Sequence, residues 1–343
     1  MSTGLKVAVL GATGAVGGEF LRLFEQRNFP VSELRLLASA RSAGKTADFQ
    51  GESLPIHAVS ADAFDGVDVA FFSAGATRSK EWASVATSAG AVVIDNSSAF
   101  RMVDDVPLVV PEINGNAITE STKLVAVPNC TAIILCMALA PLRALGSIQR
   151  VIVSTYQSAS GGGAAMMQYL LDDTKAYLDG EEGTDNRPEG LPPYAFNVFS
   201  HNTPILESGA NEEEAKVMAE SRKILGDESI RFNVTCVRVP VLRAHCESVT
   251  VEFAEEAPTV EAVRDVLTDA AGVRLVDVRE ANRFPMPRLA GEQNDVLVGR
   301  IRPDVSNPNG LCMFIAGDQL LKGAALNAVQ IAELMQDRGY LPT

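Results

Sequence analysis

The sequence predicts a two-domain α/β protein, in which a parallel sheet covered by helices is followed by an α+β domain built on a mixed sheet. The chain has 343 residues, which exceeds the usual size of a single domain. Up to about residue 127, short apolar runs alternate with segments of helical spacing, as in a parallel sheet covered on both faces. Beyond Cys130 the runs alternate apolar with polar residues, which is typical of a mixed or antiparallel sheet.

Five apolar runs in the first part of the chain predict buried strands, and two intervening segments predict helices. The predicted strands are Leu5–Leu10, Leu34–Ala38, Val67–Phe72, Ala91–Ile94 and Lys123–Val127. The predicted helices, Ala15–Gln26 and Ser79–Ala89, carry apolar residues at helical spacing. We place this first domain at residues 1–129.

The second part of the chain opens with a strongly apolar helix, Thr131–Leu145, and continues with strands and further helices. The predicted strands are Arg150–Gln157, Arg231–Pro240, Ser248–Phe253, Val296–Pro303 and Leu311–Ala316. The further predicted helices are Ala164–Leu178, Asn211–Leu225 and Val260–Ala270. We place the second domain at residues 130–320 and expect the C-terminal helix, within residues 321–343, to pack on the first domain.

The composition of the chain weighs against several classes of function. The net charge of −14 weighs against binding to nucleic acid or to an anionic membrane surface. The longest apolar stretch, Ala132–Leu142, is shorter than the roughly 20 residues that cross a bilayer. The five cysteines are scattered without C-x-x-C spacing, so neither a metal site nor a disulfide framework is expected. We expect a cytoplasmic protein that holds small anionic ligands with a few well-placed cations.

The first predicted strand leads directly into a glycine-rich loop and a helix. In the pattern G-x-x-G-x-x-G, Gly11 permits a tight turn, Gly14 lets the backbone approach a pyrophosphate, and Gly17 lets helix and strand pack closely. The N-terminus of the following helix suits phosphate groups. The alternative is a glycine-rich turn without a ligand. We predict a Rossmann-type dinucleotide site that includes Gly11, Thr13, Gly14, Ala15, Val16 and Gly17.

The end of the second strand indicates which nicotinamide cofactor binds. A site that prefers NAD usually carries an acidic residue there, which holds the ribose 2′-hydroxyl. Here the strand is followed by Ser39, Arg41 and Ser42, whose hydroxyls and guanidinium suit a 2′-phosphate. The sequence therefore predicts NADPH, NADP(H) being the cofactor pair. The alternative is that Arg41 is an ordinary surface cation.

Cys130 stands out as a candidate nucleophile. It lies between a predicted strand and the apolar helix, where the helix dipole and nearby amides favour a thiolate and can stabilise an oxyanion. Cys136, Cys236 and Cys312 lie within apolar runs and are expected to be packing residues. Among the three histidines, His245 lies just past a strand, where it could reach a cleft and act as an acid or base.

Four blocks, together with the glycine-rich start, resemble the aspartate-semialdehyde dehydrogenase family. They are Asn96–Arg101, Pro128–Thr131, Gln157–Gly161 and Cys236–His245, in the family's order and spread over most of the chain. The resemblance implies NADPH-dependent reductive dephosphorylation of L-aspartyl 4-phosphate to L-aspartate 4-semialdehyde through a cysteine thioester. This reaction lies on the route to lysine (through diaminopimelate), threonine, methionine and isoleucine. It also implies a homodimer or homotetramer, with the second domain's sheet as the interface.

The resemblance also implies residue roles. Cys130 is the nucleophile, His245 the acid/base catalyst, and Gln157 positions the substrate. Arg238 pairs with the substrate α-carboxylate. The remaining residues implied to bind ligands are Arg101 and Lys216 for phosphate, Glu213 and Asn129 for the substrate, and Asn327 for the cofactor. Three consecutive glutamates, Glu212 to Glu214, leave the role of Glu213 open by one position.

Several structural or rival explanations compete with these roles. Arg101 could pair with Asp104 or Asp105, and Glu213 with Lys216 could be a solvated helix pair. His57 and His201 lie in polar or loop-like stretches away from any motif. A related acyl-phosphate or acyl-CoA reductase, or an inactive NADP-binding regulator, would share the same scaffold.

One position departs from the family pattern. Cys246 follows His245 where a small hydroxyl residue is common, which places a second thiol near the site and predicts added sensitivity to oxidation.

Overall fold

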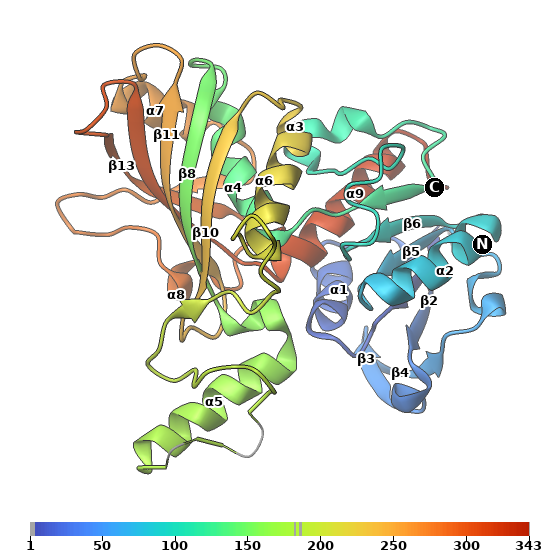
Figure 1. The fold of residues 1–343 in the computed structure, drawn as a ribbon. Helices are drawn as coiled ribbons and strands as arrows, with labels where there is room; N and C mark the ends of the chain where they lie inside the picture. The colour runs from blue at the N-terminus through green and yellow to red at the C-terminus, as the bar shows by residue number, and fades with distance from the viewer. Residues whose placement is uncertain (1–3, 182, 185–186, 343) are drawn as a thin grey trace. The chain divides into compact units, whose positions relative to one another are not determined.

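The computed structural model describes residues 4–181, 183–184 and 187–342. Contacts between Cα atoms divide the chain into two compact units. The first holds the residues up to Asn129 together with those from Ala324 onward, and the second holds Cys130–Gly323. Within the described residues, each unit is built on its own seven-stranded sheet (Figure 1).

The sheet of the first unit is parallel except at one edge. Its strands lie in the order β3-β4-β2-β1-β5-β6-β7, and only β3 pairs antiparallel with its neighbour. The chain leaves the central strand β1 for β2 on one side and later returns to β5 on the other, and such a switch point is where parallel sheets bind ligands. The strands are β1 (Leu5–Leu10), β2 (Val31–Ala38), β3 (Thr46–Phe49), β4 (Glu52–Ala58), β5 (Val69–Phe72), β6 (Val92–Asp95) and β7 (Leu124–Ala126).

Helices cover both faces of this sheet. Phe71 and Phe72 are neighbours in β5 and therefore point to opposite faces. Two phenylalanine rings of α1 (Ala15–Gln26) pack at tilted angles against Phe71, whereas α2 (Ala76–Ser88) packs into the cluster that contains Phe72. The last helix, α9 (Leu326–Asp337), contacts α1, β6 and the short α3 (Pro111–Asn114), so it belongs to the face of α1.

The sheet of the second unit is mixed. Its order is β12-β13-β14-β11-β8-β10-β9, with β8 parallel to β10 and β12 parallel to β13. The other neighbours pair antiparallel. The strands are β8 (Ile148–Gln157), β9 (Phe199–Ser200), β10 (Arg231–Arg238), β11 (His245–Phe253), β12 (Val273–Leu275), β13 (Val296–Pro303) and β14 (Gly310–Gly317).

Helices cover one face of the second sheet and leave the other accessible. The covering helices are α4 (Cys130–Leu142), α6 (Glu212–Leu225) and α7 (Val260–Thr268), and α4 touches β13, β14 and the other two. Because α4 is surrounded in this way, it can be apolar on every side. On the opposite face, alternate residues of β8 and β11 such as Ser154, Tyr156 and Thr250 are exposed or half-exposed. We call this surface the open face.

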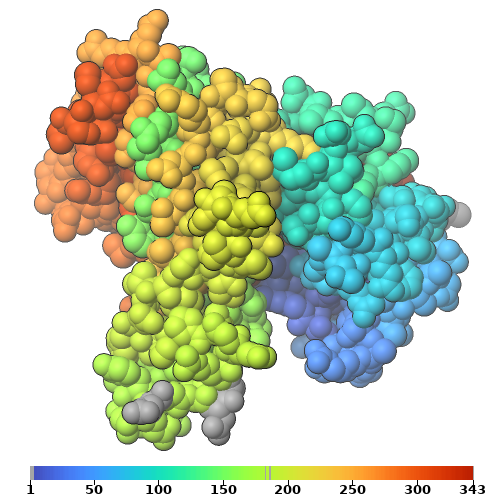
Figure 2. Space-filling view, in the orientation of Figure 1, coloured from blue at the N-terminus to red at the C-terminus, as the bar shows by residue number. Residues whose placement is uncertain are grey.

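A helical lobe extends the second unit. It consists of α5 (Ala164–Leu178) and the chain that follows, and Figure 2 shows it projecting from the rest of that unit in green and yellow. Several large apolar side chains are exposed on it, including Tyr177, Leu178 and Phe196.

The predicted fold class is confirmed, and most element boundaries agree within a few residues. The hairpin of β3 and β4 was not predicted, because its exposed residues show no sustained apolar alternation. The helix predicted at Thr131–Leu145 begins at Cys130 and ends at Leu142. A single π-helical stretch, Leu321–Ala325, precedes α9 where the C-terminal helix was expected.

Glu247 on β11 is an exception to the rule that buried polar groups are bonded. It is fully buried, and neither carboxyl oxygen has a hydrogen-bond partner among the described residues. Burial raises the pKa of this carboxyl well above its usual value, which favours the neutral acid in the folded protein.

This pKa shift predicts a pH-dependent stability. The unfolded chain releases the Glu247 proton above about pH 4.5, whereas the folded protein retains it, so stability falls as pH rises between these two pKa values. Glu247→Gln removes that dependence with almost no change of shape. Its melting temperature should exceed that of the unsubstituted protein at pH 8, and the gap should narrow toward pH 5. Glu255→Gln, at an exposed position, serves as the control, and an equal gap at both pH values would contradict the prediction.

Candidate active site

A cavity of about 290 Å³ opens in the first unit at the end of β1. It lies at the switch point of the parallel sheet, beside the glycine-rich loop and the end of β2. Its lining residues are Leu10, Gly11, Thr13, Gly14, Ala38, Ser39, Arg41, Ser42, Val59, Ser73, Ala74 and Arg78.

Steric constraints explain the glycines of this loop. Gly11 has φ +97°, and a Cβ there would lie 2.5 Å from the carbonyl oxygen of Ser73. A Cβ on Gly17 would lie 2.4 Å from the carbonyl oxygen of Gly11. Gly14 precedes α1 as its N-cap without a side-chain cap, so the first amides of the helix keep their capacity to bind phosphate. The loop therefore fits a dinucleotide pyrophosphate.

The far side of the cavity is polar and basic. The predicted Ser39, Arg41 and Ser42 line it, and no acidic residue appears among the lining residues that the structure describes. Arg78, on α2, also lines it and forms an ion pair of 2.7 Å with Glu81. The prediction missed Arg78 because an arginine on an exposed helix carries no signal in the sequence.

Four predicted cofactor residues do not line this cavity. Ala15, Val16 and Gly17 belong to α1, behind the loop. Asn327 is fully buried in α9, and its amide donates to the carbonyl of Val109 at 2.8 Å. The structure thus gives Asn327 a part in holding the fold.

Arg101 and Asn129 are both buried in the first unit. The Arg101 guanidinium donates to the carbonyl oxygens of Val127 and Asn96, each at 2.9 Å. Asp104 and Asp105, the rival partners, are exposed. Two backbone carbonyls therefore orient this arginine.

Cys130 is the first residue of α4 and is half-buried. A Cβ at Gly323 would lie 2.9 Å from the Cys130 Cβ and 3.3 Å from the Gln319 Cβ. Only glycine lets the backbone at 323 lie against the candidate nucleophile, and the same contact brings Gln319 beside it.

Gln157 and Glu213 meet in the interior of the second unit. The Gln157 Nε2 donates to the Glu213 carboxylate at 3.1 Å, and the Thr155 hydroxyl donates to the Gln157 Oε1 at 3.1 Å. The other two glutamates of the run are used elsewhere. Glu214 forms a capping box with Asn211, and Glu212 pairs with Lys216 at 3.4 Å. Of the three, Glu213 is thus the one that contacts Gln157, and Lys216 pairs with Glu212 instead of Glu213.

Arg238 and His245 lie at the ends of β10 and β11, the two strands that flank β8. The Arg238 Nε donates to Asn202 at 3.1 Å, and its Nη1 donates to the carbonyl of Ser158 at 3.2 Å. The His245 Nδ1 accepts from the backbone N–H of Ser158 at 3.0 Å. Both side chains crowd Gly161, where a Cβ would lie 3.0 Å from the imidazole and 3.1 Å from the guanidinium.

The environment of this cluster disfavours positively charged imidazole. Burial, and then the charge of Arg238, lower the pKa of His245 well below its usual value. His201 was expected in a loop away from any motif, but it is buried close to Arg238, Glu213 and Lys216. Burial, followed by Arg238, lowers the pKa of His201 to about 4.

The other cysteines fill structural places. Burial raises the pKa of the Cys136 thiol to about 12 and raises that of Cys236 well above its usual value, as expected for packing residues. Cys246 packs with small apolar side chains, and burial raises its pKa to about 12, which disfavours the thiolate that oxidants attack. Cys312 was predicted to be buried, but it is half-exposed on the open face, 3.5 Å from the Thr250 hydroxyl.

Comparison with known proteins shows to which family a chain with this geometry belongs. The model for "Semialdehyde dehydrogenase, NAD binding domain" matches residues 6–121, and that for "Semialdehyde dehydrogenase, dimerisation domain" matches residues 139–322. The aspartate-semialdehyde dehydrogenase of Synechocystis sp. is 55% identical over 99% of this chain and 100% of its own. The chain belongs to the aspartate-semialdehyde dehydrogenase family.

Solved structures agree with this membership. Aspartate semialdehyde dehydrogenase II from Vibrio cholerae has a TM-score of 0.92 at 42% identity, covering 97% of this chain and 99% of its own. A second structure of that enzyme, complexed with ASA, gives 0.93 at 41% identity, covering 98% and 99%. The resemblance seen in the sequence to the aspartate-semialdehyde dehydrogenase family is therefore confirmed.

Metal and membrane features are absent from the part of the chain that the structure describes. There, no three His, Cys, Asp or Glu side chains gather as a metal site would require. No described helix combines the length and the apolar character needed to cross a membrane.

The glycine geometry of this family member predicts contrasting effects at two adjacent positions. Gly17→Ala forces a Cβ against the Gly11 carbonyl and should destabilise the protein by about 1–3 kcal/mol. Gly18→Ala, where a Cβ meets nothing within 4 Å in the same helix, should stabilise it by up to about 1 kcal/mol. Urea denaturation measures both, and equal effects would remove the steric explanation for Gly17.

Proposed function

We propose that this protein catalyses the NADPH-dependent reductive dephosphorylation of L-aspartyl 4-phosphate to L-aspartate 4-semialdehyde. The observation that carries the proposal is the set of buried polar side chains at the ends of β8, β10 and β11, namely Gln157, Arg238 and His245. Cys130 belongs to the same unit, beside Gln319, which is linked by hydrogen bonds to Ser160 and Ser158 near His245. Family membership supports the choice of substrate.

The first half of the reaction transfers the acyl group to Cys130. The thiolate sulfur attacks the acyl carbon, the carbon–oxygen bond to phosphate breaks, and phosphate leaves with that electron pair. The α4 N-terminus favours the thiolate and can stabilise negative charge on the acyl oxygen. The product is a thioester on Cys130, which accepts hydride more readily than a carboxylate.

The substrate is held by its charged groups. We assign Arg238 to the α-carboxylate and Glu213, oriented by Gln157, to the other polar group of the aspartyl moiety. Arg101 and Lys216 are assigned to phosphate, and Asn129 to the substrate beside the nucleophile. His245 is the acid/base group. In a protein of net charge −14, such individually placed cations must overcome the overall field.

NADP(H) is the proposed cofactor, and when bound its nicotinamide supplies the hydride. Gly11, Thr13 and Gly14 would hold the pyrophosphate, and Ser39, Arg41 and Ser42 the 2′-phosphate. Asn327, whose buried amide donates to the Val109 carbonyl, stays assigned to the cofactor by the family resemblance.

We further propose a cytoplasmic homodimer that joins two second units through their open faces, either alone or as half of a tetramer. The family model that covers residues 139–322 describes a dimerisation domain. The open face presents Tyr156 and Phe314, whose rings are 5.9 Å apart, among small polar side chains. In the cell, the enzyme would serve the synthesis of lysine, threonine and methionine.

The nucleophile assignment is tested by NADP reduction with aspartate semialdehyde, with and without phosphate. The unsubstituted protein should give a phosphate-dependent rise in reduced nicotinamide, and Cys130→Ala should lower its rate by more than about 1,000-fold. Cys312→Ser removes another partly exposed thiol and should retain the rate. Phosphate-dependent turnover by Cys130→Ala would exclude this cysteine as the nucleophile.

The cofactor assignment is tested by exchanging NADP for NAD. Arg41→Ala should raise the KM for NADP about 10-fold to 100-fold, because it removes charge-assisted hydrogen bonds, and should leave the KM for NAD nearly unchanged. Lys45→Ala removes the same charge at an exposed position that does not line the cavity. An equal rise for both cofactors would refute the 2′-phosphate role.

A further inference from the structure

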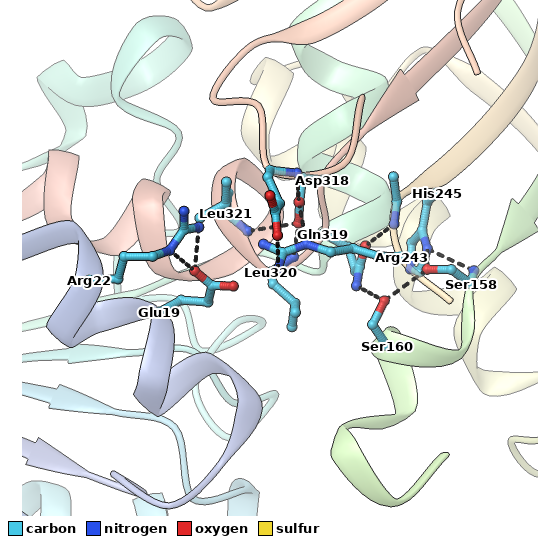
Figure 3. A network of polar contacts seen from close by, with 12 residues as sticks. Glu19, Arg22, Ser158, Ser160, Arg243, His245, Asp318, Gln319, Leu320 and Leu321 are labelled. Carbon is cyan, nitrogen blue, oxygen red and sulfur yellow. Dashed lines mark hydrogen bonds and ion pairs between the residues drawn. The ribbon is translucent and has the colours of Figure 1, made fainter. Parts of the chain in front are cut away.

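The side-chain amide of Gln319 has only one possible orientation. It follows β14 in the second unit, and its Oε1 accepts from the backbone N–H of Ala244 at 3.0 Å. A backbone N–H can only donate, so the amide cannot exchange its oxygen and nitrogen. The Nε2 therefore points at the Ser160 hydroxyl and donates to it (Figure 3).

That donation sets the direction of the next two hydrogen bonds. A serine hydroxyl has one proton, and the Ser160 Oγ lies 3.0 Å from the Ser158 Oγ. Gln319 engages one of the two lone pairs of the Ser160 hydroxyl, whose single proton is available to Ser158. The Ser158 Oγ in turn lies 3.1 Å from the His245 Nδ1 and donates to it. The result is a one-way chain from Gln319 through two serines to His245.

The His245 Nδ1 thus faces two donors. Besides the Ser158 hydroxyl, the backbone N–H of Ser158 points at the same nitrogen from 3.0 Å. A nitrogen that receives two protons from neighbours must offer a lone pair, so it carries no proton itself. The proton of the neutral imidazole then resides on Nε2.

The Nε2 atom is buried and has no hydrogen-bond partner among the described residues. It lies beside Gly161, at 3.0 Å from where a Cβ would stand, and the Arg238 Nη1 lies 3.1 Å from the same point. The absence of a side chain at Gly161 leaves room there for a ligand atom. The Nε2 atom of His245 faces that space and is a hydrogen-bond donor.

The charges around the ring favour the same neutral state. Burial opposes a second proton on the imidazole, and so do Arg238, at the end of β10, and His201, which follows β9. Among the residues that the structure describes, no carboxylate contributes to the shift in the pKa of His245.

We propose that Gln319, Ser160 and Ser158 are positioning residues that hold His245 in the tautomer with the proton on Nε2. Resting His245 then presents a hydrogen-bond donor to the acyl oxygen of the substrate, which is the acid side of its proposed acid/base role. As the thiolate attacks, the acyl oxygen gains negative charge and the Nε2–H bond to it strengthens, while the proton stays on nitrogen. This inference rests on the proposed function for the identity of the acyl group.

Nitrogen NMR of the resting enzyme tests the tautomer without substrate or cofactor. The protein carries three histidines, and His57→Asn and His201→Asn variants assign the signals of His245 by elimination. Between pH 6 and pH 8, the expected spectrum shows a protonated Nε2 and an unprotonated Nδ1. A protonated Nδ1, or a doubly protonated ring, would overturn the proposal.

Two variants test the chain itself. Gln319→Glu keeps the shape but offers only acceptors to Ser160, and Ser160→Ala removes the middle hydroxyl. Each should shift the titration midpoint of His245 upward and lower kcat about 10-fold or more, with the KM for phosphate little changed. Ser208→Ala, at an exposed turn position of the same unit, is the control. Unchanged titration in both variants would refute the positioning roles.

These readouts separate the inference from the proposed function. If the unsubstituted protein does not turn over aspartate semialdehyde, the substrate assignment is overturned. The tautomer of His245 is measured by NMR on the free enzyme and does not depend on that result. A spectrum with Nδ1 protonated would overturn the inference even in a fully active enzyme.

Discussion

The burial of polar side chains at the ends of β8, β10 and β11 is the constraint on which the second unit depends. Gln157, Arg238 and His245 are each at most 4% exposed. A buried polar group without a partner costs free energy comparable to a lost hydrogen bond or more, so each of these side chains needs partners placed by other elements. Glu213 from α6, Asn202 after β9 and the Ser158 backbone supply them.

That requirement accounts for several residues that look ordinary along the chain. The capping box of Asn211 and Glu214 fixes the start of α6, and this in turn directs Glu213 inward to Gln157. Glu214 also accepts from the backbone N–H of Cys236 at 3.0 Å, which ties α6 to β10. A helix cap and a strand contact therefore position a candidate substrate residue, although neither touches the substrate.

In the first unit, the space between backbone segments limits which residues the glycine-rich loop can contain, and hydrogen bonds of polar side chains matter less. The backbone at Gly11 and Gly17 packs so closely that any side chain would overlap a carbonyl oxygen. This packing joins β1 to α1 and leaves the loop open at Gly14, where a phosphate can approach. The same principle recurs in the second unit, where Gly161 and Gly323 clear space around His245 and Cys130. Glycine thus shapes both the candidate cofactor site and the candidate catalytic site.

The sequence by itself determined the fold class, most strands and helices, the dinucleotide loop and the family, because these depend on local periodicity and on short motifs with fixed spacing. It also identified Cys130 and His245 from their places next to predicted strands, and Arg238 through the family resemblance. Only the structure could decide which of Glu212, Glu213 and Glu214 turns inward, because consecutive helix residues of the same type differ only in the direction in which their side chains point. Only the structure showed which further residues lie in the candidate sites, namely His201, Arg78, Ser158, Ser160 and Gln319. It also showed that Asn327 does not line the cavity of the first unit. Gln319 and Ser160 are 159 residues apart in sequence, and their hydrogen bond depends on how β14 and β8 lie in one sheet. No local pattern carries that information, because only the folded chain brings such residues within hydrogen-bond distance.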